Sequence, residues 1–235
     1  MNNENIKQNI SLIKSNIEQV AKKFSRNAEK IKIIAVSKTQ SIEAISAAFY
    51  AGATIFGENY VQELVEKQSL LSKKGILPEW HFIGHLQTNK VKYIAPFVSL
   101  IHSVDSEKLA SEISRQAEKN NRTIDILLQI NTSGEISKFG CEPDEAINLA
   151  ERVSSLPNVK LKGLMTIGTF SDDEAIIRKE FRLLRSKLEE INDKLGLSLN
   201  ELSMGMSHDY EIAIEEGATM VRIGTAIFGK RHYNR

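Results

Sequence analysis

Residues 31–39 read Ile31-Lys32-Ile33-Ile34-Ala35-Val36-Ser37-Lys38-Thr39. The run up to Val36 is short, β-branched and almost continuously apolar. Such a run predicts a strand that is buried on both faces, as parallel strands are. Polar residues begin abruptly at Ser37, so the strand is expected to end there. This places Lys38 at the carboxyl end of a buried strand.

Similar short apolar runs recur along the chain, and helical patterns separate most of them. The further runs are Thr54–Phe56, Trp80–Ile83, Val98–His102, Ile124–Ile130, Val159–Met165, Glu201–Ser203 and Thr219–Ile223. Alternation of this kind fits both a (β/α)8 TIM barrel and an open doubly wound sheet. The count of about eight strands in 235 residues favours the barrel.

Helical periodicity is clearest in three places. Before the first strand, apolar residues spaced 3 and 4 apart form one stripe: Ile6, Ile10, Ile13, Ile17, Val20 and Phe24. Residues 1–27 are therefore expected to form an extra N-terminal helix that packs on the barrel. A helix over 177–195 is opened by Ser171-Asp172-Asp173-Glu174, which has capping-box spacing, and another helix is expected to start near Pro143. No Pro/Gly/Ser-rich linker divides the chain, so residues 1–235 are expected to form a single domain.

Composition excludes several classes of protein. The net charge of +1 gives no electrostatic reason for binding nucleic acid or an acidic membrane. A single cysteine, Cys141, suits a reducing compartment, and no apolar run is long enough to span a bilayer. We expect a soluble cytoplasmic protein that is a monomer or a weak dimer.

Candidate chemistry lies where the predicted strands end, since both folds gather functional groups at that edge. A lysine there can simply extend to water. If the barrel mouth partly desolvates it, however, Lys38 becomes a neutral amine that attacks a carbonyl.

Two segments after the last two strands are candidate phosphate sites, Ser203–His208 and Arg222–Thr225. Each offers glycine and a hydroxyl where backbone N–H groups can receive an anion. Ser207 alone could be only a helix cap.

Other motifs point away from common alternatives. The chain contains neither G-x-G-x-x-G nor G-x-x-x-x-G-K-[ST], which argues against dinucleotide and nucleoside triphosphate sites. His81 and His85 are four residues apart, but the glutamate of a zincin helix does not follow His81, so no metal site is expected. No serine stands in G-x-S-x-G, which leaves a serine hydrolase unsupported.

Together, five segments resemble the pyridoxal phosphate homeostasis protein family. They run in order over nearly the whole chain: Ile34–Thr39, Phe56–Glu63, Trp80–Lys90, Ser203–Asp209 and Val221–Gly229. The resemblance implies a fold-type III barrel that binds pyridoxal 5′-phosphate (PLP), related to the N-terminal domain of alanine racemase.

The resemblance also implies roles for individual residues. Lys38 would hold PLP as a Schiff base, and Arg222 would face the pyridine nitrogen. The phosphate would be bound by Ser207 and by the backbone at Gly224 and Thr225. Asn59, Met165 and Ser203 would line the cofactor.

Two further positions concern the handling of PLP. Lys138 matches a loop lysine that the family is thought to use for a second PLP. Relatives often have a lysine two positions after the Schiff-base lysine, whereas this chain has Gln40. A transfer role for that lysine is therefore in doubt here.

Three functions are compatible with the sequence, and the first of them is the one that we expect. The first is a carrier that buffers PLP or delivers it to apo PLP-dependent enzymes, without robust turnover. A cationic Arg222 would disfavour protonation of the pyridine ring and weaken it as an electron sink.

The second is a PLP-dependent amino-acid racemase. That enzyme needs an acid/base group on the far face of the cofactor, usually a tyrosine from an extra β-domain, and the barrel is expected to use all 235 residues. Tyr60 is the best candidate for such a group, although packing in the next helix is the simpler role. The third function, a Schiff-base aldolase without cofactor, leaves the match around Arg222 unexplained.

Overall fold

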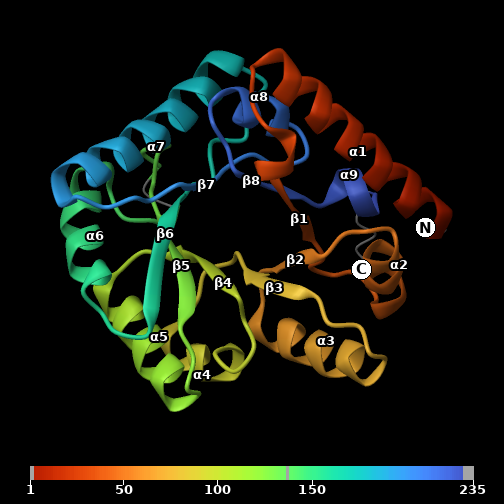
Figure 1. The fold of residues 1–235 in the computed structure, drawn as a ribbon, viewed down its shortest axis with the longest axis horizontal. Helices are drawn as coiled ribbons and strands as arrows, with labels where there is room; N and C mark the ends of the chain where they lie inside the picture. Colours follow the sequence, from red (N-terminus) through yellow and green to blue (C-terminus); the bar gives the residue numbers. More distant parts are fainter. Residues whose placement is uncertain (1–2, 136–137, 230–235) are drawn as a thin grey trace.

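The chain forms a closed barrel of eight parallel strands in sequence order, with helices on the outside (Figure 1). The computed structural model describes residues 3–135 and 138–229, so residues 1 and 2 of the expected N-terminal segment lie outside it. The strands are β1 Lys32–Val36, β2 Ile55–Glu58, β3 Glu79–Phe82, β4 Leu100–Val104, β5 Ile124–Gln129, β6 Val159–Met165, β7 Glu201–Ser203 and β8 Met220–Ile223.

Pairing of the first strand with the last closes the barrel. β1 and β8 are in parallel register from Lys32 opposite Met220 to Ala35 opposite Ile223. This pairing confirms the (β/α)8 barrel and rules out the open doubly wound sheet. Some strands end later than their apolar runs predict, because a neighbour extends the ladder. Glu58, for example, pairs with Phe82 of β3.

The helices surround the strands (Figure 1). The α-helices are α1 Asn3–Lys23, α2 Ile42–Tyr50, α3 Val61–Lys73, α4 Val91–Ile94, α5 Glu107–Lys119, α6 Ala146–Ser154, α7 Glu174–Leu195, α8 Tyr210–Glu215 and α9 Thr225–Phe228. Short 3-10 turns precede β1 at Ala28–Lys30, α4 at Thr88–Lys90 and α6 at Pro143–Glu145. The last of these confirms Pro143 as a helix start.

Helix α1 is the extra N-terminal helix, and it packs against α2, α8 and α9. Its four isoleucines are buried, as the stripe predicts. Phe24 is the exception and remains 39% exposed. The helix ends at Lys23, and Ser25 then turns the chain with a φ of 54°, so Phe24 leaves the buried face.

The capping box expected before α7 does not form. The N-cap is Asp173, whose carboxylate accepts a hydrogen bond from the N–H of Ala175. Ser171 instead accepts from the N–H of Asp173, in a turn before the helix. An aspartate at the N-cap satisfies the same backbone donors, so the helix begins two residues later than the Ser171 cap would set.

The apolar core has two parts. The larger part lies between the strands and the helices. A smaller cluster inside the barrel consists of Ile34, Leu100, Leu127, Met165 and Met220. Buried polar side chains share this interior, among them His81, His102, Ser203 and Arg222.

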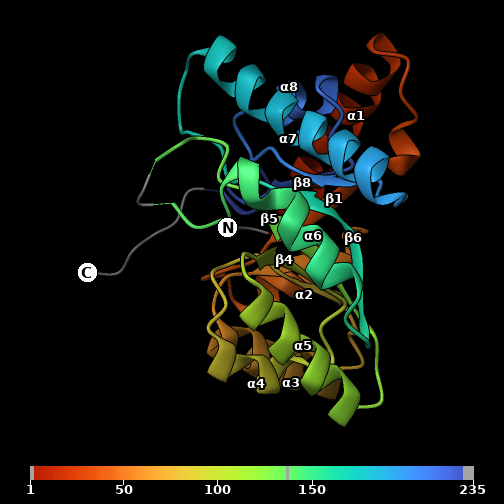
Figure 2. The ribbon, with the colours of Figure 1, turned by 90° about the vertical axis from the view of Figure 1, so that its left-hand side faces the viewer.

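Two long loops extend from the carboxyl end of the barrel. The loop after β5 and the loop after β6 project on the same side, at the left of Figure 2. Lys138 of the first loop donates to the Gly168 carbonyl of the second at 3.3 Å. Within the described residues, no helix has the length and apolar character needed to cross a membrane.

Candidate functional site at the barrel mouth

The residues that the sequence singles out lie around one end of the barrel. Lys38 and Asn59 follow β1 and β2, Met165 and Ser203 end β6 and β7, and Arg222 belongs to β8. Ser207 lies in the loop before α8, and Gly224 and Thr225 follow β8. Since the strands are parallel and close into a ring, all eight positions share the carboxyl edge.

Lys38 is half-buried and begins a turn directly after β1. Its neighbours on both sides are held by two acidic side chains. The Ser37 hydroxyl donates to Glu58 at 2.6 Å, and the N–H of Thr39 donates to Glu63 at 2.5 Å. Thr39 has a φ of 65°, so the chain bends sharply immediately after Lys38.

Lys67 of α3 joins these anchors. Its ammonium donates to the Ser37 carbonyl, Glu58 and Glu63, each within 2.6–2.7 Å. These three bonds use all three of its N–H donors. The Lys67 and Glu58 side chains are only 6% and 0% exposed. The turn that carries Lys38 is therefore fixed by a buried ion pair.

Burial raises the pKa of Glu58, and the charge of Lys67 opposes that effect. The second oxygen of Glu58, Oε2, has no hydrogen-bond partner among the described residues. A buried carboxylate of this kind depends on its cation, because desolvation is costly for an unpaired charge. The ion pair is thus a structural requirement of the Lys38 turn. No sequence pattern relates Glu58 to Lys67, although Glu58 stands within the family-like segment 56–63.

Ser207 joins the two candidate phosphate segments. Its hydroxyl oxygen accepts from the N–H groups of Gly224 and Ala226 at 3.2 and 3.3 Å. The alternative that Ser207 caps its helix is wrong. α8 begins at Tyr210, with Asp209 at its N-cap. Both N–H groups point at the Ser207 oxygen, whose own proton remains available to donate, so hydroxyl and backbone donors of the two segments lie next to one another, as around anion sites.

Arg222 lies inside the barrel, with 5% of its surface exposed. It donates to the Ser203 hydroxyl and to the Thr166 carbonyl, both at 2.8 Å. Burial lowers the pKa of the guanidinium to about 10, and the charge of Asp209 partly opposes this. Arg222 therefore keeps its positive charge at neutral pH.

The donor set fits PLP. An amine, a hydroxyl with two backbone N–H groups, and a cation match an aldehyde, a phosphate and a pyridine nitrogen respectively. The amide oxygen of Asn59 is buried without a hydrogen-bond partner in the described part of the chain. Asn59 itself is held by close packing. A side chain at Gly84 would place a Cβ within 2.3 Å of the Asn59 carbonyl oxygen.

Aromatic side chains and Lys138 occupy the rim. His85 stacks on Phe139 with ring centroids 3.9 Å apart, and Phe170 contacts His208 at 4.7 Å. Lys138 forms an ion pair with Glu135 at 2.7 Å. Tyr60 is the N-cap residue of α3 and is 58% exposed, so it does not pack in the first turn as expected.

The remaining candidates divide between interior and rim. His81 is buried inside the barrel, whereas His85 is 39% exposed on the rim, so the two do not share a site. Burial raises the pKa of the Cys141 thiol to about 12, with Asp105 adding to the shift. The thiol is therefore protonated at neutral pH and is a poor nucleophile.

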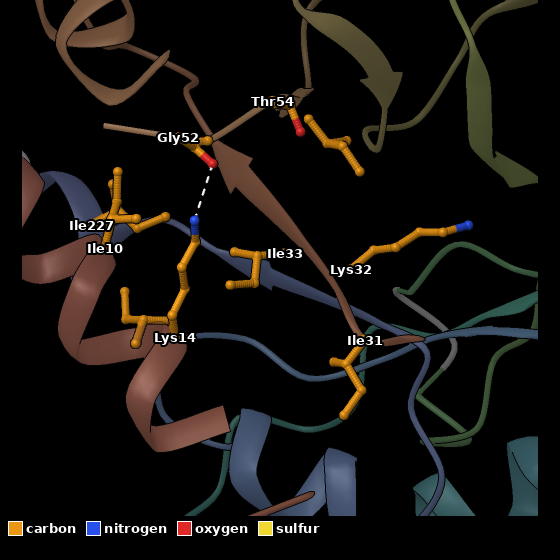
Figure 3. Close-up of a pocket in the computed structure, with 11 residues that line it drawn as sticks. Ile10, Lys14, Ile31, Lys32, Ile33, Gly52, Thr54 and Ile227 are labelled. Atoms are coloured by element: carbon orange, nitrogen blue, oxygen red, sulfur yellow. Dashed lines mark hydrogen bonds between the residues drawn. The ribbon is translucent and has the colours of Figure 1, made fainter. Parts of the chain in front are cut away.

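A separate cavity of about 200 Å³ lies at the other end of the barrel (Figure 3). It is lined by α1 and by the amino ends of β1 and β2, and includes Ile10, Ile31 and Ile33. Lys14 bridges one side by donating to the Gly52 carbonyl at 3.3 Å. Because β1 runs away from this cavity toward Lys38, the cavity is not part of the mouth.

Comparison with known proteins gives a consistent picture. Residues 8–232 match the family described as alanine racemase, N-terminal domain. The chain is 44% identical to the pyridoxal phosphate homeostasis protein of Aquifex aeolicus, over 96% of this chain and 98% of that protein. It is 43% identical to the protein of the same name from Haemophilus influenzae, over 98% of each.

One solved structure is PipY of Synechococcus elongatus PCC7942 with PLP bound. It is 35% identical to this chain, with a TM-score of 0.80, over 91% of this chain and 100% of that one. The similarity extends over nearly the whole chain, and it therefore includes both the predicted motifs and the barrel that carries them. The chain belongs to the alanine racemase N-terminal domain family and, within it, to the pyridoxal phosphate homeostasis proteins.

Proposed function

We propose that this protein binds PLP as a Schiff base on Lys38 and serves intracellular PLP homeostasis, buffering the cofactor or delivering it to apo PLP-dependent enzymes. The observation that carries the proposal is the grouping of Lys38, Ser207, Arg222 and Gly224 at one barrel mouth. Residues 1–235 act as one PLP-binding domain, in the cytoplasm, as a monomer or weak dimer. Lys138 remains a candidate for a second PLP.

Neighbouring strands support this binding mode. Lys38 follows β1, and Gly224 follows β8, the strand paired with β1. Lys38 therefore follows the strand next to the one that precedes the N–H groups bound to Ser207. PLP has an aldehyde and a phosphate on neighbouring arms of one ring, so adjacent strands suit its two ends. Asn59, Met165, Ser203 and Thr225 complete the proposed lining.

Arg222 disfavours chemistry that needs a strong electron sink, and a racemase, which can still run on such a ring, would need an acid/base group on the far face of the cofactor. A buried cation opposite the pyridine nitrogen disfavours protonation of that nitrogen, because like charges repel at low dielectric. An unprotonated ring withdraws electrons weakly, and electron withdrawal is the chemistry that PLP supplies to enzymes. Tyr60 is too exposed to act as a well-positioned acid/base group. We therefore expect no robust turnover.

The test measures exchange and delivery with the same preparation. PLP-loaded protein is incubated with each L- and D-amino acid in deuterated water, and exchange at Cα is followed by NMR. A missing acid/base group costs about 10²–10⁴-fold in rate, so we expect exchange near background. In parallel, the loaded protein is mixed with an apo PLP enzyme, and recovery of that enzyme's activity is measured against free PLP.

The two measurements separate the candidate functions. Background exchange together with recovery of the apoenzyme supports the carrier. Exchange of any amino acid at about 1–10³ s⁻¹, an ordinary turnover rate, would establish a racemase or a related enzyme instead. Failure to bind PLP at all would overturn the proposal.

Ser207→Ala tests the phosphate position. The variant should bind PLP about ten- to a hundredfold more weakly, since a hydrogen bond to a charged group contributes roughly 1.5–3 kcal/mol. Pyridoxal, which lacks the phosphate, should lose much less affinity. Calorimetric titration with both ligands measures the difference. Ser171→Ala, which removes a loop hydroxyl bound to the Asp173 N–H, is the control. Equal weakening for both ligands would show that Ser207 only joins the two loops.

A further inference from the structure

Beneath the mouth, a continuous chain of hydrogen bonds crosses the barrel interior. Arg222 donates to Ser203 at 2.8 Å, and Ser203 bonds Nδ1 of His102 at 2.9 Å. Nε2 of His102 lies 3.0 Å from Nδ1 of His81, and Nε2 of His81 lies 3.0 Å from Glu79. These residues belong to β8, β7, β4 and β3, so the chain joins opposite walls.

The surroundings make this chain unusual. Ser203 and His102 are fully buried and His81 is 1% exposed, whereas the Glu79 side chain is 51% exposed at the amino end of β3. Buried polar groups in an apolar interior destabilise the fold unless each is paired. Here every polar atom of the two imidazoles has a partner. The chain thus connects the buried guanidinium with a carboxylate at the far end of the barrel.

The end groups set the direction of the bonds. The bond from His81 is the main cause that lowers the pKa of Glu79, so this carboxylate is ionised and can only accept. Nε2 of His81 therefore carries a proton. Burial is the main cause that holds the pKa of His102 well below its usual range, and the charge of Arg222 adds to it, so His102 is neutral.

For the case in which both imidazoles are neutral, a single arrangement of protons satisfies these hydrogen bonds. Nδ1 of His81 accepts, so Nε2 of His102 donates to it. Nδ1 of His102 accepts, so the Ser203 hydroxyl donates to it and receives the bond from Arg222. Every donor points away from the guanidinium and toward Glu79. Two of the other charges at this end, Lys32 and Glu201, pair with each other at 2.6 Å.

We propose that Glu79, His81, His102 and Ser203 are positioning residues that fix the Arg222 guanidinium and balance its charge from the opposite end of the barrel. The inference rests on the proposed function, in which Arg222 faces the pyridine nitrogen of PLP. The Thr166 carbonyl, 2.8 Å from the other terminal nitrogen, completes the grip. Through these hydrogen bonds, the affinity of the barrel mouth for PLP depends on the distant Glu79 carboxylate.

The first test uses the full-length protein without cofactor, labelled with ¹⁵N. Long-range proton–nitrogen NMR assigns the histidine tautomers, and both His81 and His102 should carry their proton on Nε2. The N–H signals of Arg222 should be sharp, because its rotation is restrained. Glu79→Leu should broaden them, and Glu79→Gln should preserve them, since the amide oxygen still accepts. A proton on Nδ1 of His102, or a cationic His102, would overturn the proposal.

The second test measures PLP affinity. Glu79→Leu should weaken binding by about tenfold, within the range measured for residues coupled through a network. Asp125→Leu is the matched control. The Asp125 side chain is 41% exposed at the start of β5 and takes no part in the hydrogen bonds between Arg222 and Glu79. Equal affinities for Glu79→Leu and the wild type would overturn the positioning role while leaving PLP binding intact. If the wild type does not bind PLP, the proposed function is wrong. The NMR experiment still tests the hydrogen bonds between Arg222 and Glu79, because it needs no PLP.

Discussion

Lys38→Ala is expected to abolish covalent PLP binding. The wild-type protein with PLP should show a visible absorption band, and borohydride should fix the cofactor to the peptide that contains Lys38. Without the amine no Schiff base can form, so the variant should lose both the band and the label. The barrel should remain folded, because Lys38 is half-buried at the mouth and is not part of the apolar core.

A second lysine variant makes this test specific. Lys138→Ala removes another rim amine, which is paired with Glu135, and should keep the band and the label on Lys38. Peptide mapping by mass spectrometry distinguishes the two sites. If Lys38→Ala retains the band and the label moves to Lys138 or to another lysine, the assignment of Lys38 is wrong.

Of the variants described, Lys67→Met is expected to lower the free energy of unfolding most. The substitution leaves Glu58 buried without its cation and removes the bond to the Ser37 carbonyl. Breaking one partner of a buried ion pair costs about 3–5 kcal/mol, which is a large part of the stability of an ordinary domain. Urea unfolding followed by circular dichroism measures the change. PLP affinity should fall as well, since the turn around Lys38 loses its anchors.

Two comparisons separate this effect from a general one. Lys73→Met changes an exposed lysine on the same helix and should alter stability by less than about 0.5 kcal/mol. The double variant Glu58→Gln/Lys67→Met removes both charges, so its loss should be smaller than the sum of the two single losses. Additive losses would mean that Glu58 and Lys67 contribute independently, contrary to the buried pair.

Local sequence determined the order of strands and helices and the strand ends at which candidate residues lie, whereas the resemblance to a family suggested the roles of Asn59, Met165 and Arg222. A strand that is buried on both faces needs an apolar run, and the run over 31–36 shows where β1 lies and where it ends. The same reasoning placed Lys38, Asn59, Ser203 and Gly224 at strand ends. These predictions succeed because burial and periodicity are properties of neighbouring residues.

Tertiary structure alone decided how these ends meet. Closure depends on pairing β1 with β8, strands that are nearly the whole chain apart. Ser207 was predicted as a phosphate ligand or a cap, but its contacts with the N–H groups of Gly224 and Ala226 arise only after closure. The Phe24 and Ser171 predictions failed because a turn and a competing Asp173 cap changed the local geometry.

The polar groups inside the barrel are the clearest example of contacts that local sequence does not predict. His81 and His102 are on neighbouring strands, but His102 and Ser203 are 101 positions apart in sequence and 2.9 Å apart in the barrel. No local pattern relates them, since each lies singly in a mostly apolar strand. Likewise, Lys67 follows helical spacing on α3, and only packing turns it toward Glu58. Sequence periodicity specifies which face a residue takes, whereas the partner across the barrel is set by strand register and closure.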